Sequence, residues 1–121
     1  MSKKILVVDD SNFMRSIITN ILKSYNITDV EHASNGLEAI EKYKNNKYDF
    51  VTMDITMDKM DGIEALKEIK KIDPKAKVVM VSAMGQKAYI LEAIKAGALE
   101  FVIKPFDKRS VEDTMNKLKN L

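Results

Sequence analysis

The stretch Phe50–Asp58 reads Phe-Val-Thr-Met-Asp-Ile-Thr-Met-Asp and predicts a short buried strand that stops at an acid. Phe50 to Met53 has the length and apolar character of a parallel strand that is buried on both faces. A carboxylate at the end of such a strand, here Asp54, is held on a rigid element and still reaches solvent, which suits chemistry in an open α/β sheet. Asp is also favoured in turns, so this stretch alone leaves open that Asp54 only begins a turn.

Four other segments have the pattern of strands. Three are short apolar runs and one, at 29–33, is weaker; they are Ile5–Val8, Val78–Val81, Phe101–Ile103 and Asp29–Ala33. The stretches between them carry apolar residues at helical spacing. The expected apolar faces are Phe13, Met14, Ile17, Ile18, Ile21 and Leu22 (helix 11–25), Leu37, Ile40 and Tyr43, Ile63, Leu66 and Ile69, Leu91 and Ile94 with Ala88 and Ala93, and Val111, Met115, Leu118 and Leu121.

Five strands that alternate with five helices predict an α/β fold with a doubly wound, five-stranded parallel sheet and right-handed crossovers. The glycines fall at expected element ends, where their conformational freedom is useful; they are Gly36, Gly62, Gly85 and Gly97. No linker or low-complexity tract divides the chain, so residues 1–121 are expected to form one domain.

The composition excludes several kinds of protein. Without Cys, the chain has no disulfide, no thiol nucleophile and no Cys-based zinc site, and its single histidine, His32, rules out a histidine metal cluster. His32 is expected at the surface of the weak strand. A net charge of +2 argues against nucleic-acid binding. No apolar stretch approaches the ~20 residues of a membrane span, so we expect a cytoplasmic protein that does not contact a membrane.

Polar residues gather where the strands end. The first strand is followed by Asp9, Asp10 and Ser11, the third by Asp54, the fourth by Ser82, and the fifth by Lys104. Each has an ordinary explanation, since Asp, Ser and Lys also cap helices or remain solvated. The carboxyl ends of parallel strands meet at one edge of the sheet, where ligands bind. It is therefore much less expected that the polar residues of all four strand ends lie there by accident than that any one of them does.

Other sites are excluded by what the strand ends lack. The first turn has no glycine, so it provides neither a dinucleotide fingerprint nor a phosphate-binding P-loop. No Gly-x-Ser-x-Gly elbow occurs, and His32 has no evident catalytic triad around it.

The set Asp9-Asp10, Asp54, Ser82 and Lys104-Pro105, in this order and spacing, resembles the receiver domain of two-component response regulators. The resemblance covers essentially the whole chain, leaves no room for an output domain, and is strongest to single-domain CheY-type regulators of chemotaxis. It implies the flavodoxin-like (βα)5 fold with strand order 2-1-3-4-5, an order known for that family. It also implies a monomer that acts as a signalling switch and not as an enzyme.

This resemblance assigns roles to the strand-end residues. Asp54 would accept the phosphoryl group of a phosphohistidine on a partner histidine kinase. One Mg²⁺ ion would be bound by Asp10, by Asp54 and by the backbone carbonyl of Thr56, while Asp9 acts mainly through a bound water. Such an ion also suits the charges, because two carboxylates 4 Å apart repel by about 4 kcal/mol at an effective dielectric constant of 20.

The remaining implied roles concern the phosphoryl group and the response to it. Lys104 and Ser82 would stabilise the phosphoryl oxygens, and the Lys104–Pro105 bond is expected to be cis. Movement of Ser82 would open space for Phe101, where Tyr is common in the family; a plain core role for Phe101 stays open. The partner surface would include Lys87, Tyr89, Ile90, Glu92, Lys95, Lys108 and Val111, some of which could simply be solvated.

One residue departs from the family pattern. Four positions after Asp54 the family usually has Pro, and this chain has Asp58. The change removes a stiff loop residue and adds negative charge near an acidic site, so we expect phosphorylation to persist with altered metal affinity or loop mobility. Thr56 and Met84 stand where the family tunes the lifetime of the phosphate.

Several functions agree with these residues. The first is a chemotaxis switch that responds to a kinase and binds a motility target or adaptor protein, with a phosphatase as a further candidate partner. The second is a phosphorelay intermediate that passes its phosphate to another protein's histidine. A Mg²⁺-dependent phosphatase is disfavoured because Thr56 stands where such enzymes commonly have a second acid. A receiver that only binds partners is disfavoured because the site is complete.

Overall fold

The chain alternates strands and helices from end to end. The structure is a computed structural model that describes residues 3–57, 60–83, 87–104 and 106–119. Its elements are β1 (Lys4–Val8), α1 (Asn12–Ser24), β2 (Asp29–Ala33), α2 (Gly36–Asn45), β3 (Phe50–Asp54), α3 (Gly62–Ile72), β4 (Val78–Ala83), α4 (Lys87–Lys95), β5 (Glu100–Lys104) and α5 (Lys108–Lys119). The predicted five strand–helix units are confirmed, and the weak strand at 29–33 forms as expected.

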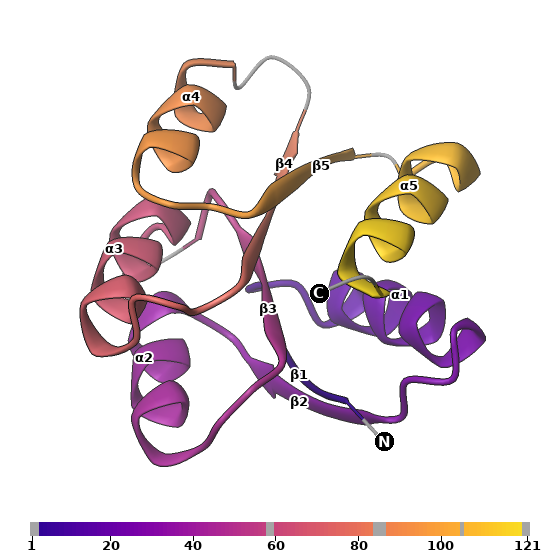
Figure 1. Ribbon diagram of the computed structural model, residues 1–121, viewed down its shortest axis with the longest axis horizontal. Helices are drawn as coiled ribbons and strands as arrows, with labels where there is room; N and C mark the ends of the chain where they lie inside the picture. The colour runs from indigo at the N-terminus through magenta and orange to yellow at the C-terminus, as the bar shows by residue number, and fades with distance from the viewer. Residues whose placement is uncertain (1–2, 58–59, 84–86, 105, 120–121) are drawn as a thin grey trace.

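The strands form one parallel sheet in the order β2-β1-β3-β4-β5, which confirms the predicted fold class. Helices α1 and α5 cover one face of this sheet, and α2, α3 and α4 cover the other (Figure 1). The apolar strand sequences follow from this arrangement, because β1, β3 and β4 are covered by helices on both faces.

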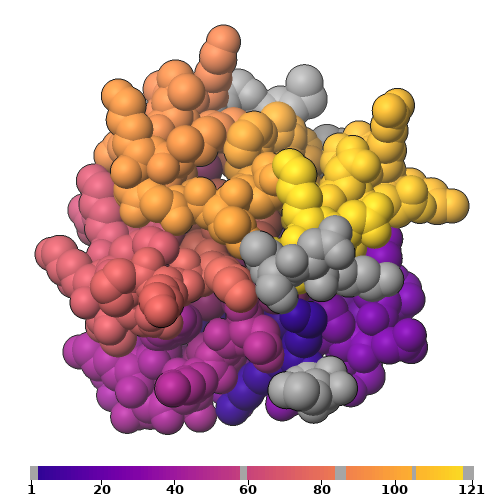
Figure 2. Space-filling view, in the orientation of Figure 1, coloured from indigo at the N-terminus to yellow at the C-terminus, as the bar shows by residue number. Residues whose placement is uncertain are grey.

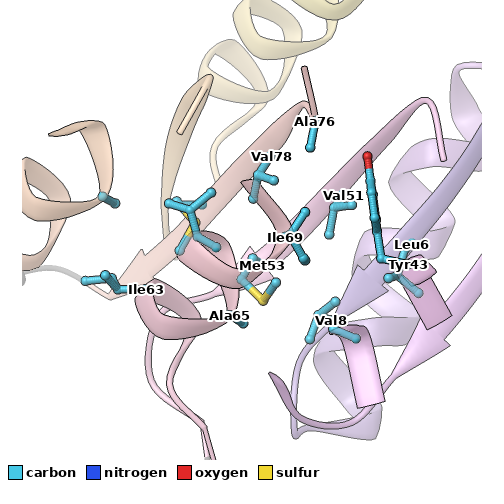
Figure 3. Packing of buried hydrophobic residues seen from close by; sticks show 14 of the residues in the cluster. Leu6, Val8, Tyr43, Val51, Met53, Ile63, Ala65, Ile69, Ala76 and Val78 are labelled. Carbon is cyan, nitrogen blue, oxygen red and sulfur yellow. The ribbon is translucent and has the colours of Figure 1, made fainter. Parts of the chain in front are cut away.

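The two faces of the sheet have separate cores. In the larger core, side chains of β1, β3 and β4 meet those of α2 and α3, with Leu6, Val51, Met53, Leu66 and Ile69 all inaccessible to solvent (Figure 3). The smaller core joins the opposite face to α1 and α5. Its buried members are Ile5, Val7, Ile18, Leu22, Ile27, Phe50, Val79, Val102, Met115 and Leu118.

Four helices begin after a polar residue whose side chain accepts a hydrogen bond from a backbone N–H of the first turn. Ser11 accepts from Met14 N at 3.2 Å, and the corresponding caps are Asn35 for α2, Asp61 for α3 and Asp107 for α5. Each cap satisfies one of the N–H groups that have no partner inside the helix. The capping role considered for Ser11 is therefore correct.

The apolar face expected for α4 is wrong for Leu91, Ile94 and Ala88 and correct only for Ala93. Ile90 and Ala93 are buried against the sheet, whereas Leu91 and Ile94 are 54% and 49% exposed and Ala88 is exposed as well. The helix lies at the periphery, orange in Figure 2. A helix of nine residues with apolar side chains nearly all round presents two almost equivalent faces, so periodicity could not choose between them.

Smaller differences concern residues at the ends of their helices. Phe13 and Leu37 were expected in the core but are 73% and 51% exposed, and each lies in the first turn of its helix. His32 is only half-buried, and its Nε2 lies 3.0 Å from Thr19 Oγ1 on α1, so it is not a simple surface residue. Gly85 and Leu121 lie outside the described residues. Of the described helices, none combines the length and apolar character that crossing a membrane requires.

Candidate functional site

The register of the sheet brings the predicted acids together. Val8 at the end of β1 pairs with Met53 of β3, so Asp9 follows at the level of Asp54. One carboxylate oxygen from each of Asp9, Asp10 and Asp54 lies within 4.8 Å of the other two. Together with Lys104 from the end of β5, these three residues form what we call the acidic pocket. The predicted gathering of strand ends is therefore confirmed.

Asp9 makes hydrogen bonds through its N–H, its carboxylate and its carbonyl oxygen. It is 1% exposed, and its N–H donates to the carbonyl oxygen of Ala33 at the end of β2, at 3.1 Å. Its Oδ1 accepts a hydrogen bond from the Ser11 N–H at 2.9 Å. Its carbonyl oxygen accepts from the guanidinium of Arg15. Asp10, in contrast, is exposed, and its carboxylate has no hydrogen bond or ion pair to a residue that the structure describes.

Lys104 is the cation of the acidic pocket. Its Nζ lies 3.4 Å from Asp9 Oδ2 and 3.5 Å from Asp54 Oδ1, so one ammonium group is shared by two buried carboxylates. Both distances are longer than those of a close charge-assisted hydrogen bond. Because the pocket has three carboxylates and one lysine, its negative charge exceeds its positive charge.

Asp54 shows the electrostatic consequence of this excess. Burial, reinforced by the charge of Asp9, raises the pKa of Asp54 to about 6, although Lys104 acts in the opposite direction. The carboxylate is 7% exposed and needs positive charge to be stable in its ionised form.

The pocket fits a hard divalent cation. Its donors are carboxylate oxygens from three residues, two of them buried, and Mg²⁺ prefers oxygen ligands of this type. The raised pKa of Asp54 shows independently that the site would be stabilised by a further positive charge. Thr56, whose carbonyl was expected to complete the site, is exposed two residues after Asp54.

Ser82 and Phe101 lie on the neighbouring strands. Asp54 pairs with Val81, so the next residue, Ser82, sits beside the pocket; it is fully buried, and its hydroxyl donates to the Ala83 carbonyl oxygen at 3.1 Å. Phe101 pairs with Met80 and packs, half-buried, against the larger core. Side chains two residues apart on a strand share a face, so Met80 and Ser82 face the same side of the sheet as Phe101.

Sequence reasoning missed the part that Gly62 plays. A Cβ at this position would lie 2.0 Å from the Asp54 carbonyl oxygen and 2.9 Å from the Ile55 Cα. The Gly62 N–H donates to the Ile55 carbonyl oxygen at 2.7 Å, which ties the first residue of α3 to the residue after Asp54. Gly62 is therefore required for close approach and not only for ending an element; its short spacing from Asp54 was the available signal.

Some of the residues expected on a partner surface are exposed, and others are buried or half-buried. Lys87, Tyr89, Glu92 and Lys95 on α4 and Lys108 on α5 are exposed. Ile90 is 9% exposed because it anchors α4 to the sheet, so its placement on the surface was wrong. Val111 is half-buried and packs against the smaller core, which leaves only part of it available.

Three residues with expected roles lie outside the described residues: Asp58, Met84 and Pro105. The cis bond expected between Lys104 and Pro105 and the effect of Asp58 therefore stay predictions.

Comparison with known proteins gives concordant relationships. Residues 5–116 match the family described as response regulator receiver domain. The chain is 52% identical over 118 residues to chemotaxis protein CheY of Thermotoga maritima, with 98% of each chain covered. It is 51% identical to chemotaxis protein CheY of Bacillus subtilis, over 99% of this chain and 100% of that protein.

A solved structure supports the same relationship. The fold superposes with a TM-score of 0.90 on a chain of the crystal structure of the CheX-CheY-BeF3-Mg²⁺ complex from Borrelia burgdorferi. The two sequences are 38% identical, and the alignment covers 97% of this chain and 89% of that chain.

Proposed function

The chain belongs to the response regulator receiver family, and on this basis we propose that it is a stand-alone phosphorylation switch of chemotaxis, with Asp54 as phosphoacceptor. The observation that carries the proposal is the acidic pocket, in which a buried carboxylate lies beside two others and 3.5 Å from a single lysine. The coverage of nearly the full length of the two CheY relatives supports the assignment of residues 1–121 to one receiver domain.

In the proposed reaction, an Asp54 carboxylate oxygen attacks the phosphorus of a phosphohistidine on a histidine kinase. The new O–P bond forms as the P–N bond breaks, and the imidazole nitrogen leaves with the electron pair and takes up a proton. The nucleophile must be ionised, which its pKa of about 6 allows for most molecules at neutral pH. The product is an acyl phosphate on the strand end of β3.

Lys104 and Ser82 stabilise the transferred group. The ammonium of Lys104 already lies between Asp9 and Asp54, so a small movement brings it to a phosphoryl oxygen that replaces part of its present contact. Ser82 donates to the Ala83 carbonyl oxygen, and rotation about χ1 would redirect its hydroxyl to the phosphoryl group. Both residues therefore respond to the charge that phosphorylation adds.

A divalent cation, which we take to be Mg²⁺, would be held by Asp10, Asp54 and the Thr56 carbonyl, with Asp9 acting through water. When bound, it neutralises carboxylate charge and charge that develops on the phosphoryl oxygens. Support comes from the donor set of this chain and from the Mg²⁺ named in the Borrelia complex.

The output is a change in partner affinity. Rotation of Ser82 would free space on the side of the sheet that Phe101 shares, and Phe101 would move inward by packing alone, because it has no hydroxyl. The surface that changes would be formed by α4, β5 and the start of α5, with Lys87, Tyr89, Glu92, Lys95 and Lys108 exposed there. Its proposed partner is a motility protein or adaptor. A phosphatase is a further candidate, and so is a relative of the CheX that is bound to CheY in the Borrelia complex.

The decisive test is Mg²⁺-dependent labelling with a small phosphodonor. Wild type is expected to form an acid-stable, base-labile phosphoprotein, whereas Asp54→Ala stays unlabelled. Asp29→Ala is a matched control, because Asp29 is exposed at the opposite end of the sheet. Equal labelling of wild type and Asp54→Ala would disprove the assignment.

Transfer assays separate the switch from a phosphorelay intermediate. Labelled protein is incubated with candidate partners that carry a phosphorylatable histidine and with motility proteins. A switch gains affinity for its target on phosphorylation and loses phosphate to water, whereas a relay protein hands the label to the partner's histidine.

A further inference from the structure

Arg15 lies in the first turn of α1, directly behind the loop that carries Asp9 and Asp10. One arm of its guanidinium donates to the carbonyl oxygen of Asp9, and the other donates to Oδ1 of Asn12. Its Nε is buried and has no hydrogen-bond partner among the described residues. The side chain is therefore fixed between the loop and the helix.

The location of this cation is unfavourable for the helix itself. No acidic residue occupies the first turn of α1, and a positive charge near a helix N-terminus opposes the helix dipole. Leaving Nε buried without a partner adds a further cost. The contacts with the Asp9 carbonyl oxygen and with Asn12 Oδ1 are the observed interactions that offset these two costs.

The Asp9 carbonyl group is linked rigidly to the backbone of Asp10. The carbonyl group of Asp9 and the N–H group of Asp10 belong to one planar peptide unit, so a donor that holds the oxygen also sets the plane from which Asp10 projects. Asp9 is otherwise fixed through its N–H and its Oδ1. The Asp10 carboxylate is exposed and has no described partner that would orient it.

We propose that Arg15 is a positioning residue for the divalent cation, which it serves by orienting the Asp9–Asp10 peptide so that the Asp10 carboxylate faces Asp54. This inference rests on the proposed function, because it assumes that the acidic pocket binds Mg²⁺. Arg15 does not touch the ion in this account and acts only through the peptide group.

Charge and positioning predict opposite effects for the loss of Arg15. A guanidinium near a cation site repels the bound ion, so Coulomb's law alone predicts tighter Mg²⁺ binding when the charge is removed. If Arg15 orients Asp10, its removal weakens binding, because the carboxylate must then be ordered when the ion binds. A purely structural role changes the stability of the protein and leaves the dissociation constant of the folded protein unchanged.

The test measures Mg²⁺ binding by isothermal titration calorimetry for wild type, Arg15→Gln, Arg15→Lys and Arg109→Gln. Arg109 is the other arginine of the chain and is exposed on α5, so its variant removes the same charge without the carbonyl contact. We expect Arg15→Gln to bind Mg²⁺ about 10-fold more weakly, the lower end of the usual effect of residues that orient metal ligands. Arg15→Lys recovers part of the affinity because its side chain, longer than that of Gln, can bring a donor closer to the Asp9 carbonyl oxygen, and Arg109→Gln binds like wild type.

A second readout does not use the ion at all. In metal-free protein, the ¹H–¹⁵N resonance of the Asp10 amide reports the orientation of the Asp9–Asp10 peptide, and we expect it to shift in Arg15→Gln more than in Arg109→Gln. Circular dichroism in EDTA verifies folding. If Arg15→Gln does not fold, Arg15→Lys decides by the same two measurements, with weaker binding and a shifted Asp10 amide expected.

The outcomes separate this inference from the function on which it rests. Unchanged or tighter Mg²⁺ binding by the folded Arg15 variants overturns the positioning role and leaves the phosphoacceptor assignment intact. Failure of wild type to bind Mg²⁺ overturns both.

Discussion

The two ends of the sheet differ in how completely their charged side chains are paired. At the carboxyl ends of the strands, three carboxylates lie together, and two of them, those of Asp9 and Asp54, share one lysine at 3.4 and 3.5 Å. At the amino ends, Lys4, Glu31 and Tyr48 form what we call the paired cluster. In it, the Tyr48 hydroxyl donates to Glu31 Oε1 at 2.6 Å, and Lys4 Nζ lies 3.1 Å from Glu31 Oε2 and 5.4 Å from the centre of the Tyr48 ring.

The pKa values of Glu31 and Asp54 are shifted in opposite directions. The hydrogen bonds from Tyr48 and Lys4 hold the pKa of Glu31 below its usual value, whereas burial and the charge of Asp9 raise the pKa of Asp54. The ionised form of Glu31 therefore stabilises the fold, and the ionised form of Asp54 opposes it. The ionised acidic pocket at the carboxyl ends of the strands therefore lowers the stability of the fold, whereas the paired cluster at the amino ends raises it.

The largest test of this comparison is Asp54→Asn, which removes the buried negative charge. A pKa raised from 3.8 to about 6 corresponds to about 3 kcal/mol, so we expect the variant to be more stable than wild type by up to this amount at pH 7.5 without divalent ions. Urea denaturation measures the difference, with Asp29→Asn as control. A less stable Asp54→Asn protein would contradict the assignment of the pocket as a destabilising element.

The pH dependence of stability follows from the same group. Asp54 has a raised pKa in the folded state, so the folded protein binds a proton more tightly than the unfolded chain between about pH 4 and pH 6. Its contribution to the free energy of unfolding therefore falls by about 2–3 kcal/mol as the pH rises through this window, and it is constant at higher pH. Urea midpoints measured from pH 4 to pH 8 should show this decline in wild type relative to Asp54→Asn; parallel curves would refute it.

At the opposite end, Tyr48→Phe should act with the opposite sign. It removes the hydroxyl that donates to Glu31 and leaves the ring, which is 8% exposed, in the core. Loss of this hydrogen bond is expected to lower the free energy of unfolding by about 1 kcal/mol. Tyr89→Phe is the matched control, because Tyr89 is 52% exposed. If Tyr48→Phe were as stable as Tyr89→Phe, the hydrogen bond from Tyr48 to Glu31 would make no contribution to stability.

The smallest effect is expected for Lys4→Met. The Lys4 and Glu31 side chains are 29% and 36% exposed, so solvent screens their attraction and the loss should be about 0.5 kcal/mol. Added salt should reduce the difference between wild type and variant. Lys75→Met, at an exposed loop position, serves as the control. An effect that persists in 1 M salt would indicate lost packing against Tyr48 instead of lost charge.

Much of the fold and of the site could be predicted because both depend on strand ends. Continuous apolar runs give the positions of buried parallel strands, and parallel strands place their final residues at one edge. Asp9, Asp54 and Lys104 could thus be assigned to one site before any distance was known. The strand order came from the family resemblance and could not be obtained from hydrophobic patterns.

The remaining features depend on contacts that leave no periodic signal. The choice between Ile90 and Leu91 as the buried side of α4 depends on how one short helix is rotated. The need for Gly62 comes from a carbonyl oxygen eight residues earlier that would meet its Cβ at 2.0 Å. The contact of Arg15 with a backbone oxygen could not be distinguished in the sequence from an ordinary solvated charge on an amphipathic helix.

The ion pair between Lys104 and Asp9 joins residues that are 95 positions apart. During synthesis Asp9 and Asp10 emerge first, Asp54 follows, and the only lysine of the pocket emerges near the end of the chain. A nascent chain that has paired β1 with β3 therefore carries its carboxylates without their internal cation. The last strand to be added, β5, supplies the charge that completes the pocket.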